Sequence, residues 1–179
     1  IYEYNFDQAG GPYDGWETTQ WRNGESADLY GFELSWQQQF TMLPGFWNGL
    51  GLYANYTWTD SEAEFPGRTE TSTLPGHSEH SGNFAVGYNK YGFDGRFSVN
   101  FHGEYVDEVG DSPGEDEYYD NHVQMDLSLS QKIQRNVKIY AEFINLTDEP
   151  LRYYVGRTTR PRQQEYYSFW SHFGIKFDI

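Results

Sequence analysis

The sequence predicts an all-β protein, an antiparallel transmembrane β-barrel, and three observations support that prediction. Apolar and polar residues alternate with a period of two along most of the chain, as on strands whose two faces meet different surroundings. Most of the alternating segments reach or exceed the roughly 9–11 residues that a tilted membrane strand needs. The connections alternate between long and short, which is typical of barrels with short periplasmic turns and long extracellular loops.

The alternation is clearest between residues 93 and 107. One face carries Phe93, Gly95, Phe97, Val99, Phe101, Gly103 and Tyr105, and the other carries Asp94, Arg96, Ser98, Asn100, His102 and Glu104. Extended along the chain, the pattern predicts eight strands, the first a remnant, at residues 1–6, 26–40, 49–60, 79–89, 93–107, 122–133, 137–146 and 165–179.

The predicted connections give the sheet an orientation. The short ones are 42–48, 89–92 and 134–136, and the long ones are 7–25, 61–78, 108–121 and 147–164. With the short turns at the periplasm, the last strand descends and the first strand ascends. Because the first segment has only six residues before its loop, we expect its lower half to lie upstream of Ile1.

The composition favours a membrane wall over a soluble core. Aromatic residues make up 20% of the chain, with 16 Tyr, 13 Phe and 6 Trp, yet the mean hydropathy is −0.83. Tyr and Trp in such numbers suit a surface that is half apolar and half wet. No apolar run approaches the ~20 residues of a membrane helix. A soluble β-sandwich or lipocalin-like barrel also alternates, but its inward apolar face would be mostly aliphatic.

Several other classes of function are disfavoured. The net charge of −15 opposes binding to nucleic acid phosphates, and the absence of cysteine rules out disulfides and thiolate metal sites. The N-terminus, Ile1-Tyr2-Glu3-Tyr4, is typical of a strand and not of a signal peptide. No Gly-x-Ser-x-Gly, phosphate-binding glycine loop or His-Glu-x-x-His motif is present, so we expect neither an enzyme nor a cofactor. The carboxylates expected in the lumen belong to a polar wall rather than to an acid/base pair: Glu33, Glu104 and Glu142.

Two motifs make the comparison with a family specific. The first is Asn23-Gly24-Glu25-Ser26-Ala27, followed by Gly31-Phe32-Glu33 at the start of a long descending strand. The second is Asn145-Leu146-Thr147-Asp148-Glu149 at the end of the penultimate strand, before a loop and a final aromatic strand. In this order and at this distance from the C-terminus, they resemble the late barrel of TonB-dependent receptors. The chain departs from the usual terminal Phe by ending in Ile179.

The resemblance covers the whole chain and implies that residues 1–179 form about the last eight strands of a barrel of about 22 strands. It places the plug domain and the energy-coupling box upstream. It implies active uptake across the bacterial outer membrane, driven through the TonB complex. The usual cargoes of the family are ferric siderophores, haem, cobalamin, oligosaccharides and other scarce nutrients.

The last long connection carries the ligand-binding hypothesis. Four arginines fall within eleven residues of an otherwise acidic chain, with tyrosines beside them and a tryptophan of lumenal parity beyond. Guanidinium groups bind carboxylate or phosphate bidentately, and aromatic rings stack on flat or sugar-like cargo. The alternative is that the arginines pair with acidic loops nearby or with lipopolysaccharide phosphates. The candidate residues are Arg152, Arg157, Arg160, Arg162, Tyr166 and Trp170.

Two further clusters are weaker candidates. The connection 108–121 and Asp107 before it carry seven carboxylates, for which a solvated loop under mutual repulsion is favoured over a divalent-cation site near lipopolysaccharide. His77 and His80 show no third ligand and are interpreted as plain polar residues, so no metal site is predicted.

The apolar face should anchor the chain in the membrane. Aromatic residues expected to face lipid include Trp36, Trp58, Phe101, Tyr105, Tyr167 and Phe169. The chief alternative is a complete eight-stranded outer-membrane barrel with a binding or structural role, which needs the six-residue first strand to seal against the last. A soluble ligand-binding barrel is the third interpretation.

Overall fold

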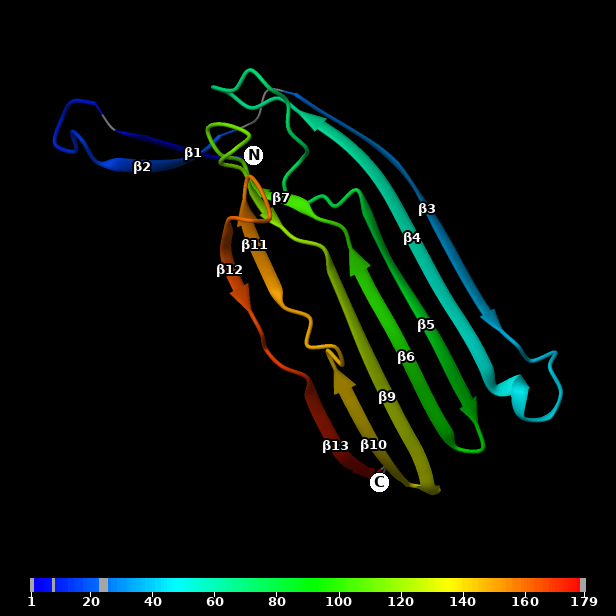
Figure 1. Ribbon diagram of the computed structural model, residues 1–179. Helices are drawn as coiled ribbons and strands as arrows, with labels where there is room; N and C mark the ends of the chain where they lie inside the picture. The colour runs from blue at the N-terminus through cyan, green and yellow to red at the C-terminus, as the bar shows by residue number, and fades with distance from the viewer. Residues whose placement is uncertain (1, 8, 23–25, 178–179) are drawn as a thin grey trace.

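The computed structural model describes residues 2–7, 9–22 and 26–177, and most of its strand residues belong to one antiparallel sheet of seven strands. In spatial order its strands are β13 (Trp170–Phe177), β10 (Val137–Ile144), β9 (His122–Gln134), β6 (Phe93–His102), β5 (His80–Lys90), β4 (Leu50–Ala63) and β3 (Ala27–Gln39). The strands lie side by side with a common tilt (Figure 1). In the described part of the chain β3 and β13 are the two edges and do not pair with each other.

The cross-strand register confirms the predicted alternation. Phe97 of β6 lies opposite Val86 of β5 and Leu127 of β9, while Ser98 lies opposite Ala85 and Asp126. Directly opposed residues share a face, so the alternation of each strand adds up over the whole sheet. We call one face the lipid face, which carries among others Phe32, Leu34, Trp36, Leu52, Phe84, Val86, Phe97, Val99, Leu127, Ile139, Phe173 and Ile175. We call the other the lumenal face, which carries among others Glu33, Gln37, Tyr53, Asn55, Asn83, Arg96, Asn100, Asp126, Ser128 and Glu142.

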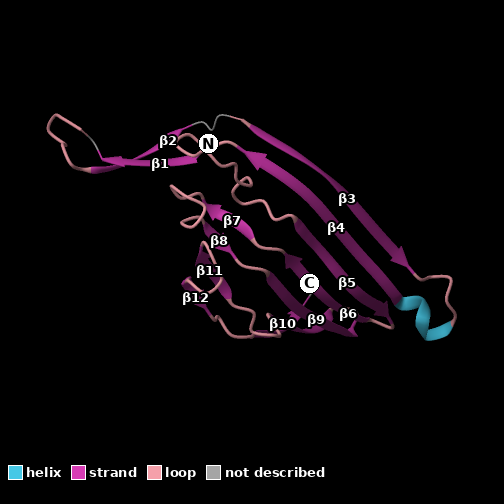
Figure 2. Cartoon of the chain, turned by 45° about the horizontal axis from the view of Figure 1, so that its top comes forward, coloured by secondary structure: helices cyan, strands magenta, loops and turns pink. Residues whose placement is uncertain are grey.

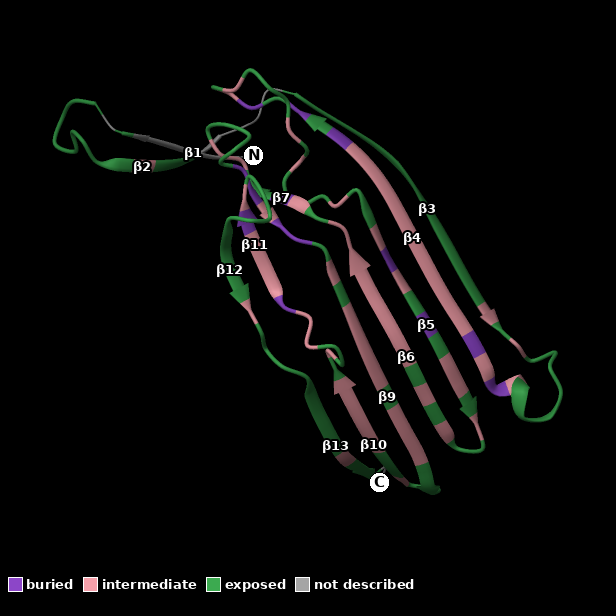
Figure 3. Ribbon diagram, in the orientation of Figure 1, coloured by how far each residue is buried: buried purple, intermediate pink, exposed green. Residues whose placement is uncertain are grey.

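The lipid face is open rather than packed against a second layer. Leu34 is 64% exposed and Phe173 63% exposed, and β3 is exposed along almost its whole length (Figure 3). An apolar face of this extent suits hydrocarbon, in which the backbone groups are already satisfied within the sheet. No helix in the described residues has the length and apolarity needed to span a membrane.

The short connections lie together at one end of the sheet, as predicted. Between β3 and β4 the chain forms the 3-10 helix η1 (Gly45–Gly49), and the β5–β6 turn places Tyr91 and Gly92 at φ values of 56° and 74°. The long connections lie at the opposite end (Figure 1). The alternation of long and short connections along the sequence therefore corresponds to the two ends of the sheet.

The long connections are more ordered than the sequence predicted. The predicted strand 93–107 stops at His102, and the chain resumes as β7 (Tyr105–Glu108) in a second sheet. This sheet, called the loop sheet below, has the order β12 (Pro161–Glu165), β11 (Leu151–Val155), β8 (Glu117–Tyr119) and β7. The predicted loops 108–121 and 147–164 thus contain strands. The predicted strand 165–179 begins only at Trp170, because residues 166–169 connect β12 to β13.

The N-terminal segment also differs from the prediction. β1 (Tyr2–Asp7) pairs with β2 (Glu17–Arg22), which lies in a stretch expected to be a loop, and the two form a separate hairpin. Glycines at the turn take positive φ values that suit a tight reversal, among them Gly10 at 82° and Gly15 at 79°. The hairpin projects away from the seven-stranded sheet (Figure 2). Asn23, Gly24 and Glu25 of the first motif lie outside the described residues.

The buried residues gather mainly where the loop sheet packs against the connection 61–78. Val106 is 3% exposed, Tyr154 5%, Ala63 3% and Phe65 8%. The N–H of Gly76 donates to the carbonyl of Val106 and ties the connection to β7. The chain is therefore a two-faced wall with a small packed core at its loop end.

Candidate functional site

A cluster of histidine and tyrosine rings stands at the top of the lumenal face. His102 is the last residue of β6 and His122 is the first residue of the adjacent β9. The two lie directly opposite each other, with ring centroids 5.5 Å apart and an angle of 13° between the ring planes. Tyr119 of β8 stacks on His102 at 4.9 Å, and it contacts Tyr153 at 4.8 Å and Tyr105 at 5.4 Å. The cluster joins the membrane strands to the loop sheet through aromatic contacts.

The tyrosines of this cluster keep neutral hydroxyl groups. Burial raises the pKa of Tyr119 to about 12, and burial also raises the pKa values of Tyr105 and Tyr153. Nearby carboxylates reinforce the upward shift of the Tyr105 and Tyr153 pKa values. The cluster therefore combines ring faces with uncharged hydroxyls, a combination that suits flat or sugar-like ligands.

Sequence reasoning missed this cluster. His102, Tyr119, His122 and Tyr153 lie on segments that meet only once the strand register is known. A partial signal was present, since His102 lies on the polar face of the predicted strand 93–107 and His122 begins the next predicted strand. Tyr105 was expected on the lipid face, but the break at Gly103 and Glu104 moves it into the loop sheet, against His102.

The structure brings the four candidate arginines to one hairpin and gives them different roles. Arg152 pairs with Asp120 at 3.0 Å. Arg162 pairs with Glu117 and, at 3.6 Å, with Glu108. Both side chains therefore bind acidic groups of a neighbouring loop, as the alternative to cargo binding predicted.

The other two arginines differ from this pair. Arg160 donates to the carbonyl of Gly114 at 3.3 Å. The side chain of Arg157 has no hydrogen-bond or ion-pair partner among the described residues, and the residue is exposed. Arg157 is thus the candidate arginine whose guanidinium stays open to an external anion.

Tyr166 and Trp170 lie beyond the hairpin. Tyr166 is 62% exposed and accepts a hydrogen bond of 2.8 Å from the Gln164 amide. Trp170 opens β13, is 54% exposed, and stacks on His172 at 5.7 Å. His172 lies opposite Glu142, which agrees with the lumenal parity assigned to Trp170.

The acidic connection is not the solvated loop that was favoured from the sequence. Asp116 is 1% exposed, and Glu117 and Asp120 are each 8% exposed. Arginines from the other long connections neutralise all three, which offsets the cost of removing their charges from water. Only the remaining carboxylates of this segment, such as Asp111, stay exposed.

The other carboxylates singled out from the sequence lie apart. Glu104 accepts a hydrogen bond of 2.8 Å from the Tyr154 hydroxyl, which lies in the loop sheet. Glu142 lies 3.6 Å from the His172 imidazole. His80 contacts the Tyr56 hydroxyl at 2.8 Å and the Glu79 carboxylate at 3.5 Å. Within the described residues, no three His, Asp or Glu side chains come together as a metal site.

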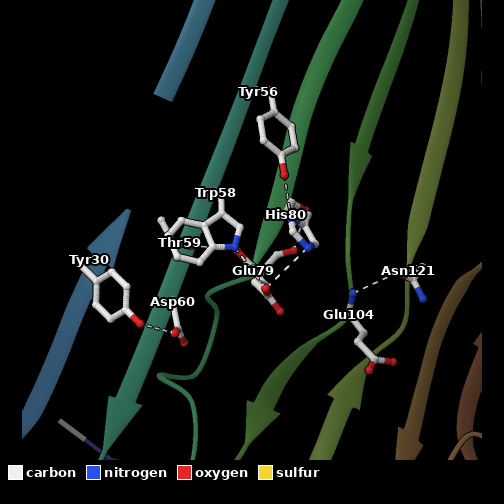
Figure 4. A network of polar contacts seen from close by, with 10 residues as sticks. Tyr30, Tyr56, Trp58, Thr59, Asp60, Glu79, His80, Glu104 and Asn121 are labelled. Atoms are coloured by element: carbon white, nitrogen blue, oxygen red, sulfur yellow. Dashed lines mark hydrogen bonds and ion pairs between the residues drawn. The ribbon is translucent and has the colours of Figure 1, made fainter. Parts of the chain in front are cut away.

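Aromatic residues of the lipid face carry polar groups that bond at the loop end of the sheet. The Tyr30 hydroxyl donates to Asp60 at 2.6 Å, and the Trp58 indole donates to Glu79 at 3.1 Å (Figure 4). Rings with one apolar and one hydrogen-bonded end are characteristic of the membrane–water boundary. These residues mark the upper interface of the wall.

A two-faced wall of tilted strands, with an aromatic boundary and ordered long loops at one end, is consistent with a portion of an outer-membrane β-barrel. A family model described as "TonB dependent receptor-like, beta-barrel" matches residues 2–146. The chain therefore belongs to the TonB-dependent receptors, which are transporters of the bacterial outer membrane and not enzymes. The comparisons with curated proteins and with solved structures gave no match.

Proposed function

We propose that residues 1–179 are the C-terminal portion of a receptor barrel whose plug and earlier strands lie upstream, and that the receptor takes up a scarce nutrient with energy from the TonB complex. The observation that carries the proposal is the family match over 2–146, on a sheet with one lipid face and one lumenal face. Lipid and lipopolysaccharide would surround the wall, and small-molecule cargo would enter past the loop sheet.

The geometry favours a cargo with flat or sugar-like faces. Arg152 and Arg162 already bind carboxylates, so they add little net positive charge toward a ligand. Around the buried Tyr119, the half-buried Tyr105 and Tyr153 offer ring surfaces and neutral hydroxyls, and Trp170 adds an exposed ring. A metal chelate built on aromatic groups, such as a ferric siderophore, or an oligosaccharide has matching surfaces.

Growth of a deletion strain tests the transport proposal. We expect the strain to lose growth on the cargo, either under iron limitation with a ferric chelate or on an oligosaccharide as carbon source. Complementation should restore growth only in cells with an intact TonB complex. Equal growth of the deletion and parent strains under both conditions would overturn both cargo assignments, and TonB-independent rescue would overturn the energy coupling.

The alternative of a complete eight-stranded barrel has less support. It requires the first strand to seal against the last, whereas β1 pairs with β2 and not with β13. The mass of the intact protein, measured after extraction from outer membranes, distinguishes a barrel of this size from a longer receptor.

A further inference from the structure

Three ring side chains follow one another down the lumenal face of β10 and β13, which lie side by side (Figure 1). Trp170 opens β13 at the loop end, and its ring stacks on His172 with centroids 5.7 Å apart. His172 makes an edge contact with Tyr140, with centroids 5.3 Å apart and planes at 73°. Because Tyr140 lies opposite Gly174, the three rings extend over about 13 Å of the wall. We call Trp170, His172 and Tyr140 the ring row.

Gly174 determines where the Tyr140 ring lies. A Cβ atom at position 174 would overlap the Cζ and the hydroxyl oxygen of Tyr140, so the ring rests directly on the glycine backbone. Because the overlap involves the outer end of a side chain, an added methyl group would displace the ring rather than the strand. Gly87 is the contrasting case on the lumenal face, since the nearest atom to a Cβ there is the Gly95 carbonyl oxygen at 3.8 Å.

A hollow of about 570 Å³ lies along the lower part of the ring row. Tyr140 and His172 line it, together with Glu142, Ser128 and Ser130. Neither serine hydroxyl has a hydrogen-bond partner among the described residues. The hollow therefore places free hydroxyl groups and a carboxylate beside aromatic ring surfaces.

The fully charged groups of the hollow balance one another. Besides His172 its ionisable lining consists of two carboxylates, Asp94 and Glu142, and two ammonium groups, those of Lys138 and Lys176. The formal charges of these four groups cancel, so the lining offers no net charge to a ligand. Such a lining favours a neutral ligand with many hydroxyl groups over a chelate with a net charge.

We propose that the ring row and the hollow beside it bind a neutral oligosaccharide in the lumen, and that Gly174 positions Tyr140 for this contact. The inference rests on the transport function proposed above and narrows its cargo. Aromatic rings pack against the apolar C–H faces of sugar rings, while hydroxyl and carboxylate groups beside them form hydrogen bonds with the sugar hydroxyls.

The test measures binding to the intact receptor purified from outer membranes, which requires no TonB complex. The probes are maltohexaose, cellohexaose and chitohexaose in titration calorimetry, with a ferric catecholate complex as the competing class of cargo. The variants are Tyr140→Ala, Gly174→Ala and the two combined. Gly87→Ala is the matched control, because it adds the same methyl group to the same face away from the ring row. Circular dichroism and the migration of unboiled samples on gels check that each variant is folded.

We expect at least one hexasaccharide to bind, and Tyr140→Ala and Gly174→Ala each to weaken its binding about twofold to twelvefold. Gly87→Ala should leave the affinity unchanged. With Tyr140→Ala already present, Gly174→Ala should cause no further loss, because no ring is left to displace. A further loss of similar size in the combined variant would overturn the positioning role of Gly174, as would equal losses in the two glycine variants.

Two other outcomes would overturn the sugar site itself. One is the absence of binding by all three hexasaccharides, and the other is sugar binding that Tyr140→Ala leaves unchanged. Binding of the ferric complex alone would overturn the sugar assignment and leave the transport proposal in place. Growth on the cargo without a TonB complex would overturn the transport proposal and leave the measured sugar binding in place.

Discussion

The guanidinium of Arg68 and the carboxylate of Asp116 form an ion pair of 2.6 Å, with side chains only 3% and 2% exposed. The pair joins the connection 61–78 to the segment between β7 and β8. The same carboxylate accepts the Gly110 N–H at 2.9 Å, and the Gly156 N–H donates to the Asp116 carbonyl at 2.8 Å. Three long connections therefore meet at one buried aspartate.

Arg68→Met should loosen the loop sheet without unfolding the membrane strands. The substitution leaves the Asp116 charge buried and without its cation, which costs about 3–5 kcal/mol of local stability. We expect faster amide hydrogen exchange in β8 and β11 and an unchanged rate in β5 and β6.

Arg157→Met is the control for this experiment, because the Arg157 side chain has no polar partner among the described residues. It should leave the exchange rates as they are. If both variants exchange alike, the buried pair does not hold the three connections together.

The strands of the wall could be predicted because their two faces meet different surroundings. Phe97 and Leu127 face lipid while Ser98 and Ser128 face the lumen, so apolar and polar residues alternate along each strand. The loop sheet has no such signature. Its strands are three to five residues long, and Tyr119 pairs with Tyr153, a residue 34 positions away.

The candidate site was predictable only in part, because its contacts also depend on the pairing of short strands that lie far apart in the sequence. The concentration of arginines before the last strand is visible in the sequence, but their partners depend on register. The pairing of β11 with β8 and β12 brings Asp120 within reach of Arg152 and Glu117 within reach of Arg162. The other members, Arg157, Arg160, Tyr166 and Trp170, are exposed and remain predicted ligand-binding residues.

The loop sheet should be sensitive to alkaline pH. Burial raises the pKa of Tyr119 from 10.0 to about 12, so the folded sheet favours the neutral phenol. The stability this provides is fully present below about pH 10 and is lost as the pH rises toward about 12. We expect the sheet to open over that range, with tyrosinate absorbance and proteolysis of the loops as the measurements.

Tyr119→Phe should make the stability of the loop sheet less dependent on alkaline pH, because phenylalanine has no proton to lose. The other tyrosines of the sheet with raised pKa values, such as Tyr154, account for what remains. Tyr13→Phe, a change at the exposed tip of the β1–β2 hairpin, should leave the profile unaltered. A Tyr119→Phe profile that matches the wild type would assign the alkaline transition elsewhere.

Trp170→Ala should weaken cargo binding more than Phe169→Ala. Trp170 shares the lumenal face with His172, whereas Phe169 stacks on Phe143 of the lipid face at 6.3 Å. An aromatic contact of about 0.5–1.5 kcal/mol corresponds to a loss of affinity of about twofold to twelvefold. Radiolabelled cargo binding to whole cells measures it once the cargo is known from growth. Equal losses in the two variants would indicate a general disturbance of β13 and remove Trp170 from the site.

The assignment of the two faces makes the sharpest prediction for the wall, and Leu127 and Ser128 test it as neighbours in the middle of β9. Lysine on the lipid face near the membrane midplane costs about 2–4 kcal/mol, because its charge cannot leave the hydrocarbon. Lysine at 128 would stand between Arg96 and Glu142 on the lumenal face, where one neighbour repels it and the other attracts it. Leu127→Lys should therefore lower the unfolding free energy of the intact receptor in phospholipid vesicles, measured in urea, while Ser128→Lys should change it little. A larger loss of unfolding free energy for Ser128→Lys than for Leu127→Lys would mean that the polar face meets lipid. The lumenal positions assigned to Trp170, His102 and His122 would then be wrong.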